Sequence, residues 1–93
     1  MRKKIQLTEH AKFEIKRRRI RERLVQEIIR TPGQVIDLKK GRQICQARYY
    51  DEFAQKEMLL RVVIEEAPGG IKVITAYKTS KLDKYWKKRG NRK

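Results

Sequence analysis

The sequence predicts an α+β fold in which two N-terminal helices pack on a four-stranded antiparallel sheet, with a short C-terminal helix. Apolar residues recur with the helical period of 3.6 in residues 7–30 and with a period close to 2 in residues 34–78. Connections between the predicted strands are too short for parallel crossovers. We expect a single domain over 1–93, with flexible basic ends at 1–6 and 90–93.

The two N-terminal helices are predicted from caps and apolar stripes. The first begins after Thr8, a favourable N-cap, and runs to about residue 18 with Ala11 and Ile15 on its core-facing stripe. The second runs over residues 21–30, where the apolar side chains share one arc. A Thr-Pro-Gly sequence ends it, because proline disfavours helix for the residue before it.

Four strands are predicted at residues 34–38, 43–50, 58–65 and 71–78, which are rich in Val, Ile, Leu and Tyr. Short polar or glycine-containing turns separate them, so we expect an antiparallel meander. The third strand is apolar at nearly every position, which is typical of a central strand buried on both faces.

A short C-terminal helix is predicted after Ser80, which is a plausible N-cap. Leu82, Tyr85 and Trp86 fall on one arc of this helix, and lysines occupy the other sides. Because the N-terminal helices can cover only one face of the sheet, we expect this aromatic arc to pack elsewhere on the sheet.

The composition points to a polyanionic partner. The chain has 26 Lys and Arg against 11 Asp and Glu, a formal net charge of +15. Nucleic acid is the first candidate for neutralising this charge, and an acidic membrane surface or an acidic protein is the next. One cysteine and one histidine are too few ligands for structural zinc, and we expect no cofactor. No apolar run has the length of a membrane span and no signal peptide is visible, so we expect a cytoplasmic protein without a membrane partner.

The basic residues are concentrated at the two ends of the chain. The first 23 positions hold 10 of them and the last 16 hold 8, whereas residues 51–66 contain five acidic and two basic residues. We therefore predict phosphate contacts on the first and last helices, although solvated helix faces remain the alternative for any one lysine. The predicted nucleic-acid-binding residues are Lys16, Arg17, Arg18, Arg19, Lys84, Lys87 and Lys88.

Several short motifs along the chain resemble a known family. They are Leu7-Thr8-Glu9-His10-Ala11, Arg18-Arg19-Ile20, Thr31-Pro32, Gly41-Arg42 and the closing Val73-Ile74-Thr75-Ala76-Tyr77-Lys78-Thr79-Ser80. The pattern is similar to the domain of unknown function 4258, a family related to the BrnT and RelE/ParE toxins of toxin–antitoxin pairs. The resemblance implies helices against an antiparallel sheet, with RNA, free or on the ribosome, and an acidic antitoxin as partners. Glu14 departs from the pattern, because such sequences often carry Arg four residues after the histidine.

Similarity to RelE-like ribonucleases implies metal-independent RNA cleavage by cationic and phenolic side chains. The predicted catalytic residues are His10, Arg61, Lys78, Lys81 and Tyr85. Arg61 lies within an apolar strand, so it must reach a carboxylate, the sheet surface or a phosphate to offset its desolvation. For His10 the alternative role is to orient the first helix, and for Tyr85 it is core packing.

These features support three hypotheses of function. The leading one is an RNA-acting protein, specifically an endoribonuclease toxin held by an acidic antitoxin. The alternative is a non-catalytic nucleic-acid-binding module, and the third is an adaptor whose basic surface docks an acidic protein. A steep salt dependence of binding fits the first two equally, so only product formation separates them.

Overall fold

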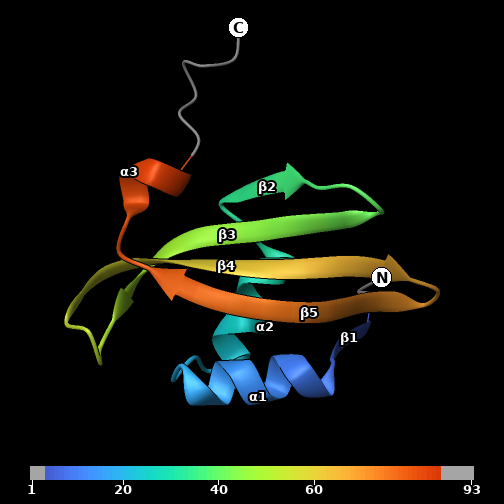
Figure 1. The fold of residues 1–93 in the computed structure, drawn as a ribbon, viewed down its shortest axis with the longest axis horizontal. Coiled ribbons are helices and arrows are strands. Elements are labelled where there is room, and N and C mark those ends of the chain that lie inside the picture. Colours follow the sequence, from blue (N-terminus) through green and yellow to red (C-terminus); the bar gives the residue numbers. More distant parts are fainter. Residues whose placement is uncertain (1–3, 87–93) are drawn as a thin grey trace, which may run out of the picture.

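The computed structural model describes residues 4–86, which form a five-stranded mixed sheet and three helices (Figure 1). In chain order the elements are β1 (Lys4–Leu7), α1 (Glu9–Arg17), α2 (Glu22–Arg30), β2 (Gln34–Asp37), β3 (Arg42–Asp51), β4 (Lys56–Ala67), β5 (Gly70–Thr79) and α3 (Leu82–Tyr85). The strand order across the sheet is β1-β5-β4-β3-β2. The β1–β5 pair is parallel, and the other three pairs are antiparallel.

The prediction of a four-stranded, purely antiparallel sheet was wrong. The α+β class and the four expected strands are present, but Lys4–Leu7 adds a fifth strand parallel to the first part of β5. Residues up to 6 were expected to be flexible, whereas residues 4–6 belong to this strand. Four residues are too few for their apolar period to predict a strand. The connection that makes the parallel pairing possible runs through all the elements between β1 and β5.

The two N-terminal helices also do not lie together on the sheet as predicted. Figure 1 shows α1 running below β5, at the border of the sheet, while α2 lies behind the strands. Thr8 caps α1 as expected, because its Oγ1 accepts a hydrogen bond from the Ala11 N–H at 3.0 Å. Ala11 and Ile15 are buried, which confirms the predicted core-facing stripe.

α1 covers a part of β5 that has no neighbouring strand. β1 pairs only with Gly70 to Val73, so the following backbone of β5 would otherwise be an exposed edge. The Thr8 hydroxyl donates to the Ile74 carbonyl at 3.4 Å, and Arg18 Nη1 donates to the Ala76 carbonyl at 2.7 Å. These two side-chain bonds attach both ends of α1 to the unpaired edge.

The main core lies between α1, α2 and one face of the sheet. Its buried side chains are Ala11, Ile15, Ile20, Val25, Ile28, Ile29, Cys45, Leu60, Val62, Ile64, Val73 and Ala76. Within the described part of the chain no helix is long and apolar enough to cross a membrane.

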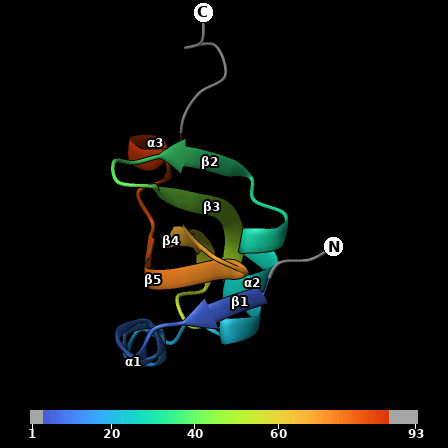
Figure 2. The same ribbon diagram turned by 90° about the vertical axis from the view of Figure 1, so that its right-hand side faces the viewer.

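The opposite face of the sheet carries only α3 among the described elements. Figure 2 shows α2 on one side of the sheet and α3 on the other. By strand register this open face includes Gln34, Ile36, Arg42, Ile44, Gln46, Arg48, Tyr50, Glu57, Leu59, Arg61, Val63, Glu65, Lys72, Thr75, Tyr77 and Thr79. The predicted C-terminal helix is thus present, although α3 spans only Leu82–Tyr85.

Candidate nucleic-acid interface

A row of four hydrogen-bonded polar side chains crosses the open face. Gln34, Gln46, Arg61 and Tyr77 stand at directly paired positions on β2, β3, β4 and β5. Gln46 Nε2 donates to Gln34 Oε1 at 2.7 Å, and Arg61 Nε donates to Gln46 Oε1 at 2.8 Å. Arg61 Nη1 donates to the Tyr77 hydroxyl at 2.7 Å. The strand register therefore sets the spacing of this polar row.

Arg61 is a buried cation without a carboxylate partner. The residue is only 8% exposed, and no Asp or Glu in residues 4–86 lies within ion-pair distance of it. Its Cζ lies 4.3 Å from the centroid of the Tyr85 ring and 5.7 Å from that of Tyr77. Neutral acceptors and aromatic faces offset part of the desolvation of a guanidinium but leave its charge uncompensated. The row therefore offers a positive charge to an anion.

α3 holds two aromatic side chains over this row. Gln46 Nε2 also donates to the Tyr85 carbonyl at 3.1 Å, which fixes the helix to β3. Trp86 packs so closely against the start of β2 that a Cβ on Gly33 would lie 2.9 Å from its Cη2 atom. The exposed Arg48 places its Cζ 4.8 Å from the Trp86 ring centroid. Aromatic rings and cations thus alternate along this part of the open face.

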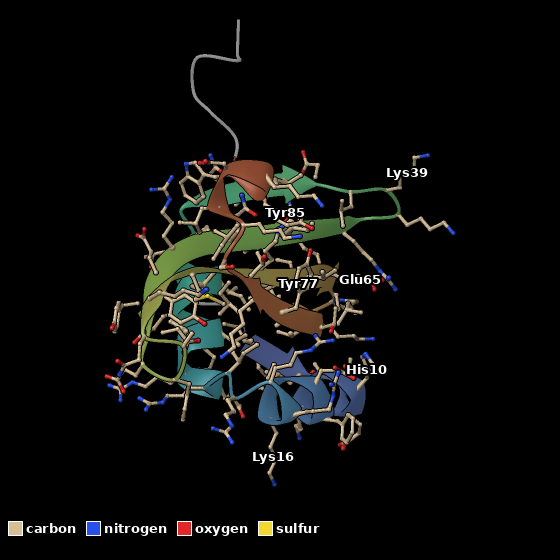
Figure 3. The ribbon with its side chains drawn as sticks, turned by 60° about the vertical axis from the view of Figure 1, so that its left-hand side comes forward. His10, Lys16, Lys39, Glu65, Tyr77 and Tyr85 are labelled. Carbon is tan, nitrogen blue, oxygen red and sulfur yellow. The ribbon has the colours of Figure 1, made fainter. Side chains whose placement is uncertain are left out.

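The five predicted catalytic residues do not converge on one site. Arg61 and Tyr85 are in contact, and the exposed Lys81 lies at the N-cap of the same short helix. Lys78 projects from the opposite face, because its neighbour Tyr77 is the residue paired with Arg61. His10 is exposed on α1, and Figure 3 shows it at the lower right of the molecule, away from Tyr85.

Lys78 belongs to a separate buried cluster with Asp51 and Tyr49. Lys78 Nζ lies 2.8 Å from Asp51 Oδ2, and the Tyr49 hydroxyl donates to the same oxygen at 2.7 Å. The Ala54 N–H donates to Asp51 Oδ1 at 2.9 Å. Burial alone raises the pKa of Asp51, but the bonds from Lys78, Tyr49 and Ala54 hold that pKa below its usual range. Burial and the bond to Asp51 raise the pKa of Tyr49. This cluster ties the end of β5 to the β3–β4 hairpin.

The predicted nucleic-acid-binding residues on α1 are in different environments. Lys16 is exposed, and Figure 3 shows it projecting away from the body of the molecule. Arg17 and Arg18 both pair with the buried Glu14, and the nearer Arg18 nitrogen lies 2.9 Å from Glu14 Oε1. The hydrogen bond from Arg17 and the charges of both arginines hold the pKa of Glu14 below its usual value. Because Arg18 also bonds to β5, its first role is to position α1.

The remaining predicted binding residues lie outside α1. Arg19 follows that helix and places its Cζ 5.2 Å from the Phe53 ring centroid. Lys84 is exposed on α3, with its Nζ 5.3 Å from the ring centroid of Tyr85. Lys87 and Lys88 lie outside the described residues.

Sequence reasoning missed the two glutamines of the polar row and did not assign Tyr77 to the site. Gln46 and Arg61 are polar interruptions in apolar strands and are equally far from the centre of the turn between β3 and β4. Fixing the register of this hairpin would have placed them opposite each other. Tyr77 then follows from the next hairpin along the chain.

Within residues 4–86 no group of three His, Cys, Asp or Glu side chains is placed to hold a metal ion.

Comparison with known proteins gives one match. The sequence model of the family described as "Domain of unknown function (DUF4258)" matches residues 7–78. The match runs from the end of β1 into β5, so it includes the polar row but stops before α3. No curated protein and no solved structure matches the chain. With most of its length matched by that model, the chain belongs to the DUF4258 family.

Proposed function

We propose that the protein binds RNA through the open face of its sheet and that Arg61 contacts a phosphate group there. The observation that carries the proposal is the burial of Arg61 without a carboxylate partner. Its Nε and Nη1 atoms are held by Gln46 and Tyr77, so the planar guanidinium is oriented before an anion arrives. Nη2 and the second hydrogen of Nη1 bond to no described residue, so they can donate two hydrogen bonds to a phosphate.

Further features of the open face favour a single-stranded RNA. Proteins recognise unpaired RNA by stacking its bases on aromatic rings or arginine planes. The Tyr85 ring lies against Arg61 and the Trp86 ring against Arg48. The exposed Lys84 lies on the same short helix, and the exposed Lys81 is its N-cap. The net charge of +15 supplies the long-range attraction and implies that affinity falls steeply with salt.

RNA cleavage without a metal is a second candidate, favoured by the contact between Tyr77 and Arg61. The Tyr77 hydroxyl accepts its bond from Arg61 at 2.7 Å, so its own proton stays available for a phosphate or leaving oxygen. Arg61 would stabilise the charge that develops on the phosphate. Neither His10 nor Lys78 takes part in this arrangement. A toxin role with an acidic antitoxin rests on this second candidate.

The binding proposal is tested by comparing two arginine variants for affinity to a fluorescent single-stranded RNA. Arg61→Gln removes the charge from the polar row, and Arg30→Gln removes the same charge from the exposed last turn of α2. Removing a charged hydrogen bond to phosphate costs about 1–3 kcal/mol, so we expect Arg61→Gln to weaken binding about 5- to 150-fold. Equal losses in the two variants would show that only net charge matters and would refute the proposal.

The cleavage candidate needs a measurement of its own. Wild-type protein is incubated with RNA in EDTA, with and without ribosomes, and the products are separated on a gel. Tyr77→Phe keeps the ring beside Arg61 but removes the hydroxyl proton, so we expect it to bind RNA and to yield no product. If the wild type also leaves the RNA intact, cleavage is excluded and the binding proposal stands alone.

A further inference from the structure

A pocket of about 330 Å³ lies between the connection from α1 to α2 and the hairpin from β3 to β4. It is separate from the polar row, because none of the four side chains of that row lines it. The volume falls within the usual range for small-molecule sites. Arg19, Arg21, Arg23, Leu24 and Phe53 are among the residues that line it.

Phe53 supplies an exposed aromatic surface in this pocket. The residue is 56% exposed, although a phenyl ring has no polar group that favours contact with water. Its ring centroid lies 5.2 Å from Arg19 Cζ and 5.8 Å from Lys78 Nζ. Tyr50, which also lines the pocket, is 62% exposed. Exposed rings at a pocket between cations suit a flat aromatic ligand.

The charges around the pocket leave one cation uncompensated. Arg21 Nη2 lies 3.7 Å from Glu52 Oε1, and Arg23 Nε lies 3.8 Å from Glu27 Oε2. Arg19 has no carboxylate partner among residues 4–86, and its guanidinium lies over the Phe53 ring. A ligand that carries negative charge beside its aromatic ring would therefore complete the site.

The backbone at Arg19 indicates that the side chain itself matters. α1 ends with hydrogen bonds from the Arg19 N–H to the Lys16 carbonyl at 3.2 Å and from the Ile20 N–H to the Ile15 carbonyl at 2.8 Å. This helix-ending motif usually has glycine at the position with positive φ, and Arg19 adopts a φ of 59°. An arginine is strained there where glycine would not be. The strained residue is the one that brings a guanidinium to the pocket.

We propose that this pocket binds a single nucleotide, with the base stacked on Phe53 and the phosphate held by Arg19. The aromatic base matches the exposed ring, and the phosphate matches the unpaired guanidinium. The same chemistry is offered by a free nucleotide and by one nucleotide of an RNA strand. Because the pocket lies away from the polar row, this inference does not depend on RNA binding by the open face.

The probe for the test is 5′-AMP, compared with adenosine and with inorganic phosphate by isothermal titration calorimetry. We expect 5′-AMP to bind more tightly than adenosine or phosphate, because it alone can stack on the Phe53 ring and also form an ion pair between its phosphate and the Arg19 guanidinium. Arg19→Gly and Phe53→Ala should each weaken 5′-AMP binding about tenfold or more. Arg30→Gln, which removes the same charge as Arg19→Gly at an exposed site, should leave it unchanged.

The midpoint of thermal unfolding shows whether a variant has lost its fold or only its affinity for 5′-AMP. Arg19→Gly relieves the positive-φ strain, so its midpoint should not fall while its affinity for 5′-AMP does. The proposal is overturned if 5′-AMP binds no better than phosphate, or if both pocket variants bind it as the wild type does. Competition between 5′-AMP and an adenosine tetranucleotide then distinguishes the sources. Displacement of the tetranucleotide assigns the pocket to a nucleotide within a strand, and absence of displacement assigns it to the free nucleotide.

Discussion

Replacing Asp51 by asparagine should destabilise the fold by releasing the end of β5 from the β3–β4 hairpin. Asparagine keeps the shape of the side chain and an oxygen for the Ala54 N–H, but it removes the charge that Lys78 and Tyr49 contact. A hydrogen bond to a charged group contributes about 1.5–3 kcal/mol. The Lys78 side chain is 17% exposed and can turn to water, so we expect the lower part of this range, about 2 kcal/mol.

This cost should appear in both thermal and urea unfolding. In a domain of this size 1 kcal/mol corresponds to about 4–8 °C, so the midpoint should fall by about 8–16 °C. Asp83→Asn makes the same chemical change at an exposed position on α3 and should shift the midpoint little. The double variant with Lys78→Met should cost less than the two single changes added together, because the partners are in contact.

The effect should also depend on pH with a defined sign. Folding lowers the pKa of Asp51, so its contribution to the free energy of unfolding is complete above the unfolded carboxyl pKa of about 4. That contribution is lost as the pH falls below this value. The difference between wild type and Asp51→Asn should therefore be about 1 kcal/mol smaller at pH 3 than at pH 7. An equal difference at the two pH values would refute the assignment of Asp51 as a charged partner of Lys78.

Three other substitutions test the fold and the site. Thr8→Ala removes the acceptor for the Ala11 N–H and should cost about 1–2 kcal/mol in urea unfolding, and an unchanged midpoint would contradict the capping role. Gly33→Ala introduces a Cβ 2.9 Å from Trp86 and should displace that ring, which a red shift of the fluorescence of this sole tryptophan would report. Arg61→Met removes a buried cation that has no carboxylate partner but leaves the buried Gln46 Oε1 without its donor, so stability should fall by only about 1–2 kcal/mol while RNA affinity falls. A loss of several kcal/mol would show that Arg61 is mainly structural.

Elements with local signals could be predicted from the sequence alone. The Thr8 cap, the apolar stripe of α1 and the buried arc of α2 depend on residues within one or two turns of each other. The strands from β2 to β5 follow from residue type and short turns in the same way. The local sequence also identified Arg61 as unusual, because a charged residue within an apolar strand needs a polar partner to offset its desolvation.

The tertiary structure decided which of these residues meet. β1 becomes a strand only because β5 offers it an edge, although more than sixty positions separate the paired residues. Strand register places Arg61 on the open face and Lys78 on the opposite face. Two residues that were predicted to share one site therefore lie in two separate clusters. Long-range packing likewise joined Arg18 to the Ala76 carbonyl of β5 and left Arg19 at the pocket. Side chains alternate between faces at every residue, so a site on a sheet depends on a pairing that the local sequence does not encode.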